Sequence, residues 1–418
     1  MSVAGIPLES FLILPIAIVA FLILLMLIVF IHEYGHFSVA RLLGVKVDVF
    51  SIGFGKPLWR WTDRKGTEWR IAVLPLGGYV KFFGDLNAAS QASPEVERKP
   101  ATTQFPSPGH EEEVAAGLTA EERKVCFHFK PVWARALIVA AGPLANFVLA
   151  VVIFAGLFMT LGRADYASTV GSVVENSAAA EAGLMPGDEI VSVNGRNIER
   201  FRQLQDQVLL SGGDTLELGV IRGEETLTLD LTPKRTETED QYGNMVETWM
   251  LGIGADQNAL SFRQYGFVAA VGEGFSELGR ILSLTIQFIS KIILGKESAD
   301  QLGGPIKMAQ YAGQSVMSGF DETAYRERPA FWDMLKVSLI NFISLAAVVS
   351  VSIGFLNLLP VPVLDGGHLM YYAYEAAAGK PLGVRAQAFG FRVGVVLLAS
   401  LMLFVTWNDI NNLLRSFS

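Results

Sequence analysis

Two histidines and a glutamate stand close together near the N-terminus, in the sequence His32-Glu33-Tyr34-Gly35-His36. Residues four apart share one face of an α-helix, so both imidazoles can reach one metal ion. Glu33 projects away from that face and can contact a metal-bound water without being a ligand. Zinc lowers the pKa of such a water, and the carboxylate can take its proton as the water attacks a carbonyl. The spacing predicts a hydrolytic zinc centre, and the plainer alternative is a set of polar residues at a helix end.

A catalytic zinc ion needs a third protein ligand. Asp365 is our candidate, because the apolar segment before it crosses the membrane in the same direction as the segment before His32. Both segments then end at the same membrane face. His368 is the rival ligand, or a group that orients another ligand. We expect Gly366 and Gly367 to permit a backbone bend that turns the Asp365 carboxylate inward.

Four apolar segments are candidates for the helices that position these side chains. A bilayer core needs about 20 apolar residues in a helix. The first segment is too long for a signal-peptide core and lacks a basic flank and a cleavage site, so we expect it to be retained. The fourth is short and needs Phe389 and Phe391 to complete a span. The segments are residues 11–31, 136–161, 337–359 and 393–405.

The composition agrees with a membrane protein that has a water-facing part. Hydrophobic residues make up 51% of the 418 residues and charged residues 18%, whereas a soluble domain carries about 25% charged residues. The net charge of −8 argues against nucleic acid as a partner. Cys126 is the single cysteine, so no internal disulfide is possible.

The distribution of basic residues predicts the orientation in the membrane. The first ten residues contain no Lys or Arg, whereas the loop between the first two apolar segments contains many, and the loop before the fourth contains Lys380 and Arg385. The positive-inside rule places both loops in the cytoplasm. The segment 162–330 is then external, and the predicted metal centre lies near the cytoplasmic side.

Three further segments have recognisable patterns. Residues 59–82 alternate in polarity around Asp63-Arg64-Lys65-Gly66, which predicts a β-hairpin. Residues 86–122 are rich in Ala, Ser, Pro and Glu, which predicts a flexible insert with at most one short helix near its end. Residues 261–294 have helical periodicity with an apolar face, which predicts a helix that lies on the membrane or packs against the external domain.

The motifs together resemble the site-2 protease family of intramembrane zinc metalloproteases, and within it the bacterial members typified by the regulator of sigma-E protease. Their order and spacing cover nearly the whole chain. The matching motifs are His32-Glu33-x-x-His36, Gly77-Gly78-Tyr79-Val80-Lys81, Gly142-Pro143-Leu144-Ala145-Asn146-Phe147 and Asn357-x-x-Pro360-x-Pro362-x-x-Asp365-Gly366.

The resemblance implies one Zn²⁺ per chain, with His32, His36 and Asp365 as ligands and Glu33 as the catalytic base. It also implies that Asn357 positions the substrate or stabilises the reacting carbonyl. Ser352 stands where such members would be expected to carry another Asn, so the role of that position does not transfer.

A protease cannot cut a peptide bond inside a helix, so the substrate must be extended and its freed backbone groups need partners within the bilayer. A strand edge near the metal centre would supply them by β-augmentation. We therefore expect the hairpin to associate with the membrane and Gly77, Gly78 and Tyr79 to position the substrate. The alternative is a surface hairpin that packs Trp59, Trp61 and Trp69 at the lipid interface.

Residues 173–195 read as a strand, a short helix, a turn and a second strand, and they resemble the circularly permuted PDZ domains of bacteria. Such domains add an extended peptide to a sheet edge and capture a terminal carboxylate in backbone N–H groups. Leu251, Gly252 and Ile253 are candidates for that loop. The alternative is a folded spacer without a ligand. The best-known enterobacterial members carry two tandem PDZ domains, whereas this chain has room for one.

The sequence predicts a polytopic α-helical membrane protein with four transmembrane helices, a membrane-associated β-hairpin and one external α/β PDZ-like domain. We divide it into a first transmembrane helix (1–48), hairpin (49–85), insert (86–130), second transmembrane helix (131–162), PDZ-like domain (163–257), amphipathic helical segment (258–330), third transmembrane helix (331–370), and cytoplasmic loop with fourth transmembrane helix (371–418).

The predicted function is cleavage of the transmembrane segment of a single-pass membrane protein, after an upstream site-1 protease has removed that protein's external part. The resemblance suggests an anti-sigma factor as substrate, with remnant signal peptides also possible, in the inner membrane of a bacterium with the PDZ-like domain in the periplasm. One alternative is a membrane-anchored PDZ receptor with a structural metal site. Another is a zinc hydrolase that acts on a lipid or a small amide.

Overall fold

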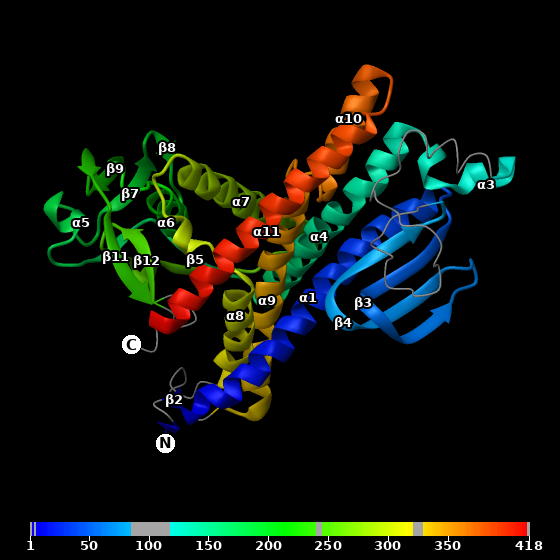
Figure 1. Ribbon diagram of the computed structural model, residues 1–418. Coiled ribbons are helices and arrows are strands. Elements are labelled where there is room, and N and C mark those ends of the chain that lie inside the picture. The colour runs from blue at the N-terminus through cyan, green and yellow to red at the C-terminus, as the bar shows by residue number, and fades with distance from the viewer. Residues whose placement is uncertain (1, 4–5, 85–117, 240–244, 321–328, 416–418) are drawn as a thin grey trace. The chain divides into compact units, whose positions relative to one another are not determined.

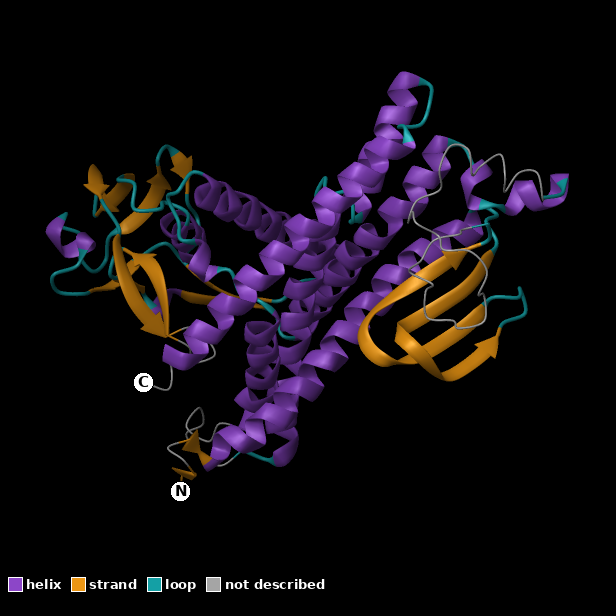
Figure 2. Ribbon diagram, viewed as in Figure 1, coloured by secondary structure: helices purple, strands orange, loops and turns teal. Residues whose placement is uncertain are grey.

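Figures 1 and 2 show a computed structural model of the chain. The chain forms two compact units. The first unit joins residues 1–150 to residues 302–418, and the second contains residues 151–301. The residues that the structure describes are 2–3, 6–84, 118–239, 245–320 and 329–415.

Among these described residues, four helices are long and apolar enough to cross a membrane, as the sequence predicts. The fourth has a candidate span from Arg385 to Asn412, which is longer than the expected segment 393–405 because the helix α11 continues beyond that segment at both ends. The four helices are α1 (Leu8–Leu42), α4 (Val132–Thr160), α9 (Phe331–Leu358) and α11 (Val384–Arg415).

Two long strands follow α1 and pair in antiparallel fashion, β3 (Val47–Thr62) and β4 (Glu68–Phe82). Both strands bend, so that Phe50 pairs with Val80 on one side and with Trp69 on the other. The start of β3 is therefore central in this small sheet. The end of β4, from residue 78 onward, has a strand partner on one side only within the described chain.

The turn between β3 and β4 is attached to the end of α1. The Asp63 carboxylate accepts hydrogen bonds from the backbone N–H groups of Lys65 and Thr67 and from the Trp69 indole. Arg41 in the last turn of α1 donates to the same carboxylate and to the Thr67 hydroxyl. This network fixes the sheet to the helix that carries the His-Glu-x-x-His sequence.

Two shorter helices accompany the long ones, α8 (Pro305–Met317) and α10 (Asp365–Ala378). The boundary expected at 370/371 falls inside α10, because the chain re-enters a helix at Asp365 instead of continuing as a loop. Helix α8 packs closely against α1, since a Cβ atom on Gly313 would lie 2.5 Å from the Ala17 Cβ.

The insert expected at 86–130 lies largely outside the described residues, and α3 (Ala120–Val125) stands near its end. The other short elements of this unit are β1 (Ser2–Val3), β2 (Ile6–Pro7) and 3₁₀ turns η2 (Phe127–Phe129) and η5 (Ser318–Phe320).

The second unit contains a four-stranded antiparallel sheet in the order β10-β9-β7-β8. Alternate residues such as Ile190, Leu218 and Val220 are fully buried and form its core with Leu204 of α6. The elements are β7 (Glu189–Val193), β8 (Arg196–Asn197), β9 (Leu216–Arg222), β10 (Glu225–Leu231), α5 (Ala178–Glu181) and α6 (Phe201–Leu209).

Strands from the two ends of this unit pair with one another. β13 (Ile253–Ala255) pairs with β6 (Val170–Val173), and β14 (Leu260–Arg263) pairs with β5 (Arg163–Tyr166). β14 lies beyond the expected domain end at 257, so the strand pairing extends the domain. The remaining elements are β11 (Lys234–Glu239), β12 (Met245–Met250), η3 (Gln257–Ala259), α7 (Phe267–Ile293) and η4 (Ala299–Gln301).

Candidate metal centre

The two histidines of α1 face each other across one turn of the helix. Their Nε2 atoms lie 3.2 Å apart. The Nδ1 atom of His36 lies 2.9 Å from the carbonyl oxygen of Ile138 on α4, so Nδ1 carries the proton that this acceptor requires. The Nε2 atom of His36 is then left with a free lone pair. A backbone carbonyl of this kind commonly orients a metal-binding imidazole.

Asp365 brings a third ligand atom to the same point. Its Oδ2 atom lies 3.1 Å from Nε2 of His32 and 3.5 Å from Nε2 of His36. A tetrahedral zinc ion with bonds of about 2.0–2.2 Å holds its ligand atoms about 3.3–3.6 Å apart. The Asp365 Oδ2 is buried and has no hydrogen-bond partner among the described residues. Three electron-rich atoms at these distances need a cation between them, so the residues fit zinc.

These three residues form the one group of His, Cys, Asp or Glu side chains in the described chain that could hold a metal ion. His368, the rival third ligand, follows Asp365 by three residues on α10 and is not in the group. The geometry therefore favours Asp365 over His368.

Asn146 on α4 orients the other histidine. Its side-chain amide lies 3.3 Å from Nδ1 of His32, and its Oδ1 atom is buried without a hydrogen-bond partner among the residues that the structure describes. Amide oxygen and nitrogen are assigned from the hydrogen-bond network, and exchanging them lets Oδ1 accept the Nδ1–H proton of His32. Sequence reasoning assigned no role to Asn146. The available signal was a polar side chain inside a membrane-spanning segment, which is costly unless it has a function.

Close approach of two helix backbones makes room for the ligands. A Cβ atom on Gly142 of α4 would lie 2.3 Å from Nε2 of His36 and 2.9 Å from Nε2 of His32. A Cβ atom on Gly35 would lie 2.3 Å from the carbonyl oxygen of Ala141. Glycine is needed at both positions because any side chain would occupy the metal centre or separate the helices.

The expected role of Gly366 and Gly367 in a bend is wrong. Both glycines lie in the first turn of α10, and neither has a positive φ. A Cβ atom on Gly366 would lie 2.2 Å from the Leu358 carbonyl oxygen, and one on Gly367 would lie 2.3 Å from that of Val361. The chain turns before them, in residues 359–364. The glycines let α10 pack against that turn, which holds Asp365 at the helix start.

The catalytic base candidate lies beside the end of β4. A Cβ atom on Gly78 would lie 3.0 Å from Cγ of Glu33 and 2.9 Å from the Ser51 carbonyl oxygen. The Glu33 side chain has no hydrogen bond or ion pair with other described residues. Gly77 has a φ of 153°, and Tyr79 is buried and stacks on Phe54.

The other residues that the sequence predicts to bind substrate or peptide are not part of the ligand group. Asn357 occupies the last turn of α9, is partly exposed, and makes no side-chain hydrogen bond within the described residues. In the second unit, Leu251 is buried in the core, and its carbonyl accepts from the Ala179 N–H at 2.9 Å. Gly252 has a φ of 79°, and Ile253 pairs with Val173 at the start of β13.

Comparison with known proteins identifies close relatives. The sequence model of peptidase family M50 matches residues 20–401 of this chain. The chain is 43% identical over 399 residues to "Putative zinc metalloprotease Atu1380" of Agrobacterium fabrum, covering 95% of this chain and 96% of that protein. It is 39% identical over 397 residues to metalloprotease MmpA of Caulobacter vibrioides, again covering 95% and 96%. A solved PDZ domain of an SdrC-like protein from Listeria monocytogenes matches 22% of this chain and 88% of that chain, with 21% identity and a TM-score of 0.18.

Proposed function

The chain belongs to peptidase family M50 and is a zinc metalloendopeptidase of bacterial membranes, and we propose that it cleaves the transmembrane segment of single-pass membrane proteins. The observation that carries the proposal is the position of the ligand group. His32 and His36 lie inside the candidate span Leu14–Leu42, and Asp365 joins them from α10. A peptide bond reaches this site only from within the membrane or at its boundary.

The proposed roles follow from the contacts of each residue. His32, His36 and Asp365 would hold the zinc ion, which supplies an activated water and polarises the scissile carbonyl. Glu33 would take the proton of the attacking water and return it to the leaving amine. Asn146 and the Ile138 carbonyl keep the two imidazoles turned with Nε2 toward the metal.

The end of β4 supports a role in binding the extended substrate. Its strand partner lies on one side only within the described residues, and Gly78 touches Glu33. A substrate strand added to the free side would pair its backbone N–H and C=O groups next to the catalytic base. Gly77, Gly78 and Tyr79 would position it in this way, and Asn357 at the end of α9 would contact the reacting carbonyl.

The proposals on membrane orientation, substrate and peptide binding rest on the sequence. We propose that the protein lies in the inner membrane, with the second unit in the periplasm and the metal centre near the cytoplasmic side, as the basic loops indicate. An anti-sigma factor or a remnant signal peptide would be its substrate, after an upstream site-1 protease has acted. Leu251, Gly252 and Ile253 would bind peptide if the external domain functions as a PDZ domain.

The alternative, a receptor with a structural metal site, is not favoured. A structural site has no need of a carboxylate beside the ligands, and Glu33 makes no hydrogen bond that would give it a structural role in the described chain.

The test is a comparison of zinc content and cleavage of a transmembrane reporter in the purified full chain. Glu33→Gln is expected to retain zinc and lose cleavage, whereas Asp365→Ala is expected to lose zinc. His368→Ala is the matched control on α10 and is expected to retain zinc. Undiminished cleavage by Glu33→Gln would contradict the proposal, and loss of zinc in His368→Ala alone would reassign the third ligand.

A further inference from the structure

An ion pair joins the helix that begins with Asp365 to the helix that orients the two histidines. Arg135, near the start of α4, donates from Nη2 to Oε1 of Glu375 on α10 at 2.6 Å. Both side chains are largely buried, with exposed fractions of 12% and 16%. Arg135 lies inside the candidate span Val132–Thr160, where a charged side chain is costly and usually has a function. The position of the pair therefore indicates a role beyond the neutralisation of two charges.

Two further contacts hold the arginine in place. Its Nε atom donates to the Lys130 carbonyl at 3.1 Å, and its guanidinium carbon lies 5.0 Å from the centre of the Tyr372 ring on α10. Tyr372 itself packs against the buried cluster that contains Ile138. A planar guanidinium that meets a carboxylate, a carbonyl and an aromatic ring has little freedom to move. The attachment of α10 to α4 at this point is therefore well defined.

On α4, the arginine belongs to the face that contacts the histidines. The residues along this face lie three or four positions apart, as one side of an α-helix requires: Arg135, Ile138, Gly142 and Asn146. The last three orient or border the imidazoles of His32 and His36 through their contacts described above. Arg135 therefore extends this face by one helical turn.

Helix α10 meets that face at two separate points. Asp365 lies beside the histidines at the level of Gly142, and Glu375 lies beside Arg135. The two points are seven residues apart on α4 and ten apart on α10, or about 10–15 Å at 1.5 Å per residue. One contact leaves a helix free to tilt, whereas two contacts at this separation fix its direction.

The start of α10 is packed against the turn that precedes it. A Cβ atom on Gly366 would lie 2.2 Å from the Leu358 carbonyl oxygen, so backbone touches backbone there. If the contact at Glu375 is lost, α10 can tilt about this packed start, and the Asp365 carboxylate turns with it. Its Oδ2 atom then leaves the position 3.1 Å from Nε2 of His32.

We propose that Arg135 and Glu375 are positioning residues of the metal centre. Their ion pair sets the tilt of α10 and so holds the Asp365 carboxylate where it meets the two imidazoles. The proposal rests on the proposed role of Asp365 as the third zinc ligand. It adds to that role a device about ten residues away that determines how well the ligand is placed.

The test is a mutant cycle on the purified full chain, with zinc affinity measured by competition with chelators of known affinity. Glu375→Gln removes the charge and keeps an acceptor oxygen. It is expected to weaken zinc binding about 10-fold, as the loss of a group that orients a metal ligand does. In the Asp365→Ala background, the same substitution is expected to change zinc affinity less than about twofold, because residues that act through one another are not additive.

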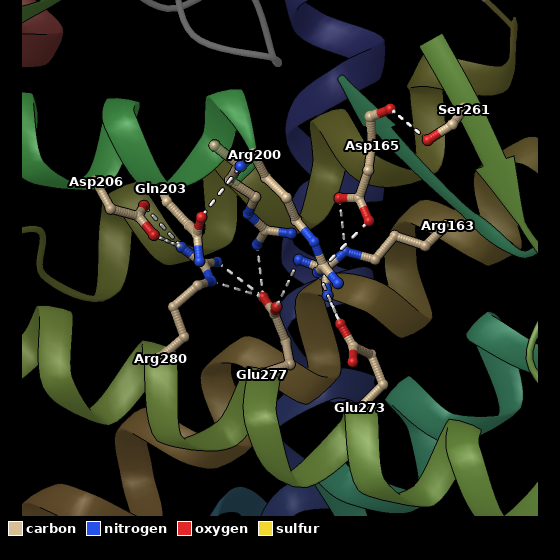
Figure 3. A network of polar contacts seen from close by, with 10 residues as sticks. Arg163, Asp165, Arg200, Gln203, Asp206, Ser261, Glu273, Glu277 and Arg280 are labelled. Carbon is tan, nitrogen blue, oxygen red and sulfur yellow. Dashed lines mark hydrogen bonds and ion pairs between the residues drawn. The ribbon is translucent and has the colours of Figure 1, made fainter. Parts of the chain in front are cut away.

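A second pair of variants approaches the contact from α4. Arg135→Lys keeps the positive charge and is expected to lose less zinc affinity than Arg135→Gln. The matched control is Asp206→Asn, which neutralises one partner of a partly buried arginine pair in the second unit. There Arg280 of α7 donates to both oxygens of Asp206 on α6, at 2.9 and 3.2 Å (Figure 3). This control is expected to leave zinc affinity unchanged.

Unchanged zinc affinity in Glu375→Gln would overturn the positioning role. Equal losses in the parent and in the Asp365→Ala background would do the same, because they would show a general loosening of the helices. Equal losses in Arg135→Lys and Arg135→Gln would show that the charge does not hold α10. If Asp365→Ala itself keeps full zinc affinity, the proposed ligand set fails, and the positioning role fails with it. Reporter cleavage plays no part in these measurements, so they do not depend on the proposed substrate.

Discussion

The side-chain amide of Asn146 lies 3.3 Å from Nδ1 of His32, so the proposed zinc ligand His32 on α1 is oriented from the neighbouring helix α4. The backbone carbonyl oxygen of the same Asn146 accepts a hydrogen bond from the Ser350 hydroxyl of α9 at 2.9 Å. The candidate metal centre thus depends on three apolar helices, α1, α4 and α9, through one buried residue.

Asn146→Ala is expected to weaken zinc binding about 10–100-fold, the usual effect of removing a group that orients a metal ligand. Zinc retention is measured by competition with a chelator of known affinity. Ser352→Ala on α9 is the control, because its hydroxyl bonds only within its own helix, to the Val348 carbonyl. Unchanged zinc affinity in Asn146→Ala would contradict the orienting role.

Gly142→Ala is expected to abolish zinc binding, because the added methyl group would lie 2.3 Å from Nε2 of His36. Gly156→Ala is a matched control on the same helix, where an added Cβ meets no atom within 4 Å. The bound zinc of both purified variants is measured by atomic emission. Full zinc content in Gly142→Ala would show that the two helices lie farther apart than described.

The stability of the second unit is expected to fall at acid pH through Asp188. Hydrogen bonds from Arg222, at 2.7 Å to each oxygen, outweigh burial and hold the pKa of the Asp188 carboxyl below its usual value. An unfolded Asp titrates near pH 3.9, so the stabilisation is complete above about pH 4 and is lost as the pH falls toward the lower folded value.

Hydrogen exchange of β7 and β9 in the full chain measures this effect between pH 7 and pH 3, after correction for intrinsic exchange rates. At pH 7, Asp188→Asn is expected to cost about 2 kcal/mol, because it removes charge-assisted hydrogen bonds. The stability of the variant should also depend less on pH than that of the parent. If the stabilities of the variant and the parent depend on pH in the same way, groups other than Asp188 cause the loss of stability at acid pH.

Asp409→Ala is expected to lower the free energy of unfolding by about 1–2 kcal/mol, as the loss of a helix cap does. Asp409 is buried on α11 and accepts from the N–H groups of Gly304, Ile306 and Lys307 at 2.9–3.0 Å. It therefore caps the start of α8 from another helix. Asp409→Asn retains one acceptor oxygen and should lose less stability; equal losses would argue against capping.

The long helices and the two histidines follow from local sequence, because hydropathy and a four-residue spacing are properties of one segment. The number of membrane crossings between the segments also makes Asp365 the predicted third ligand, and its Oδ2 atom lies 3.1 and 3.5 Å from the Nε2 atoms of His32 and His36. The prediction that Gly366 and Gly367 form a bend is wrong. A sequence does not distinguish a glycine that adopts a positive φ from one that lacks a side chain so that another backbone can pack against it.

The sequence by itself therefore predicts a zinc-dependent chemistry and four helices long and apolar enough to cross a membrane. Only the tertiary structure decided which groups support that chemistry: Asn146 and the Ile138 carbonyl behind the histidines, Gly142 beside them, and Gly78 against Glu33. The physical reason is that these contacts join residues from about 45 to more than 100 positions apart in the chain. Their specificity lies in distances between backbones, which no spacing along one segment encodes.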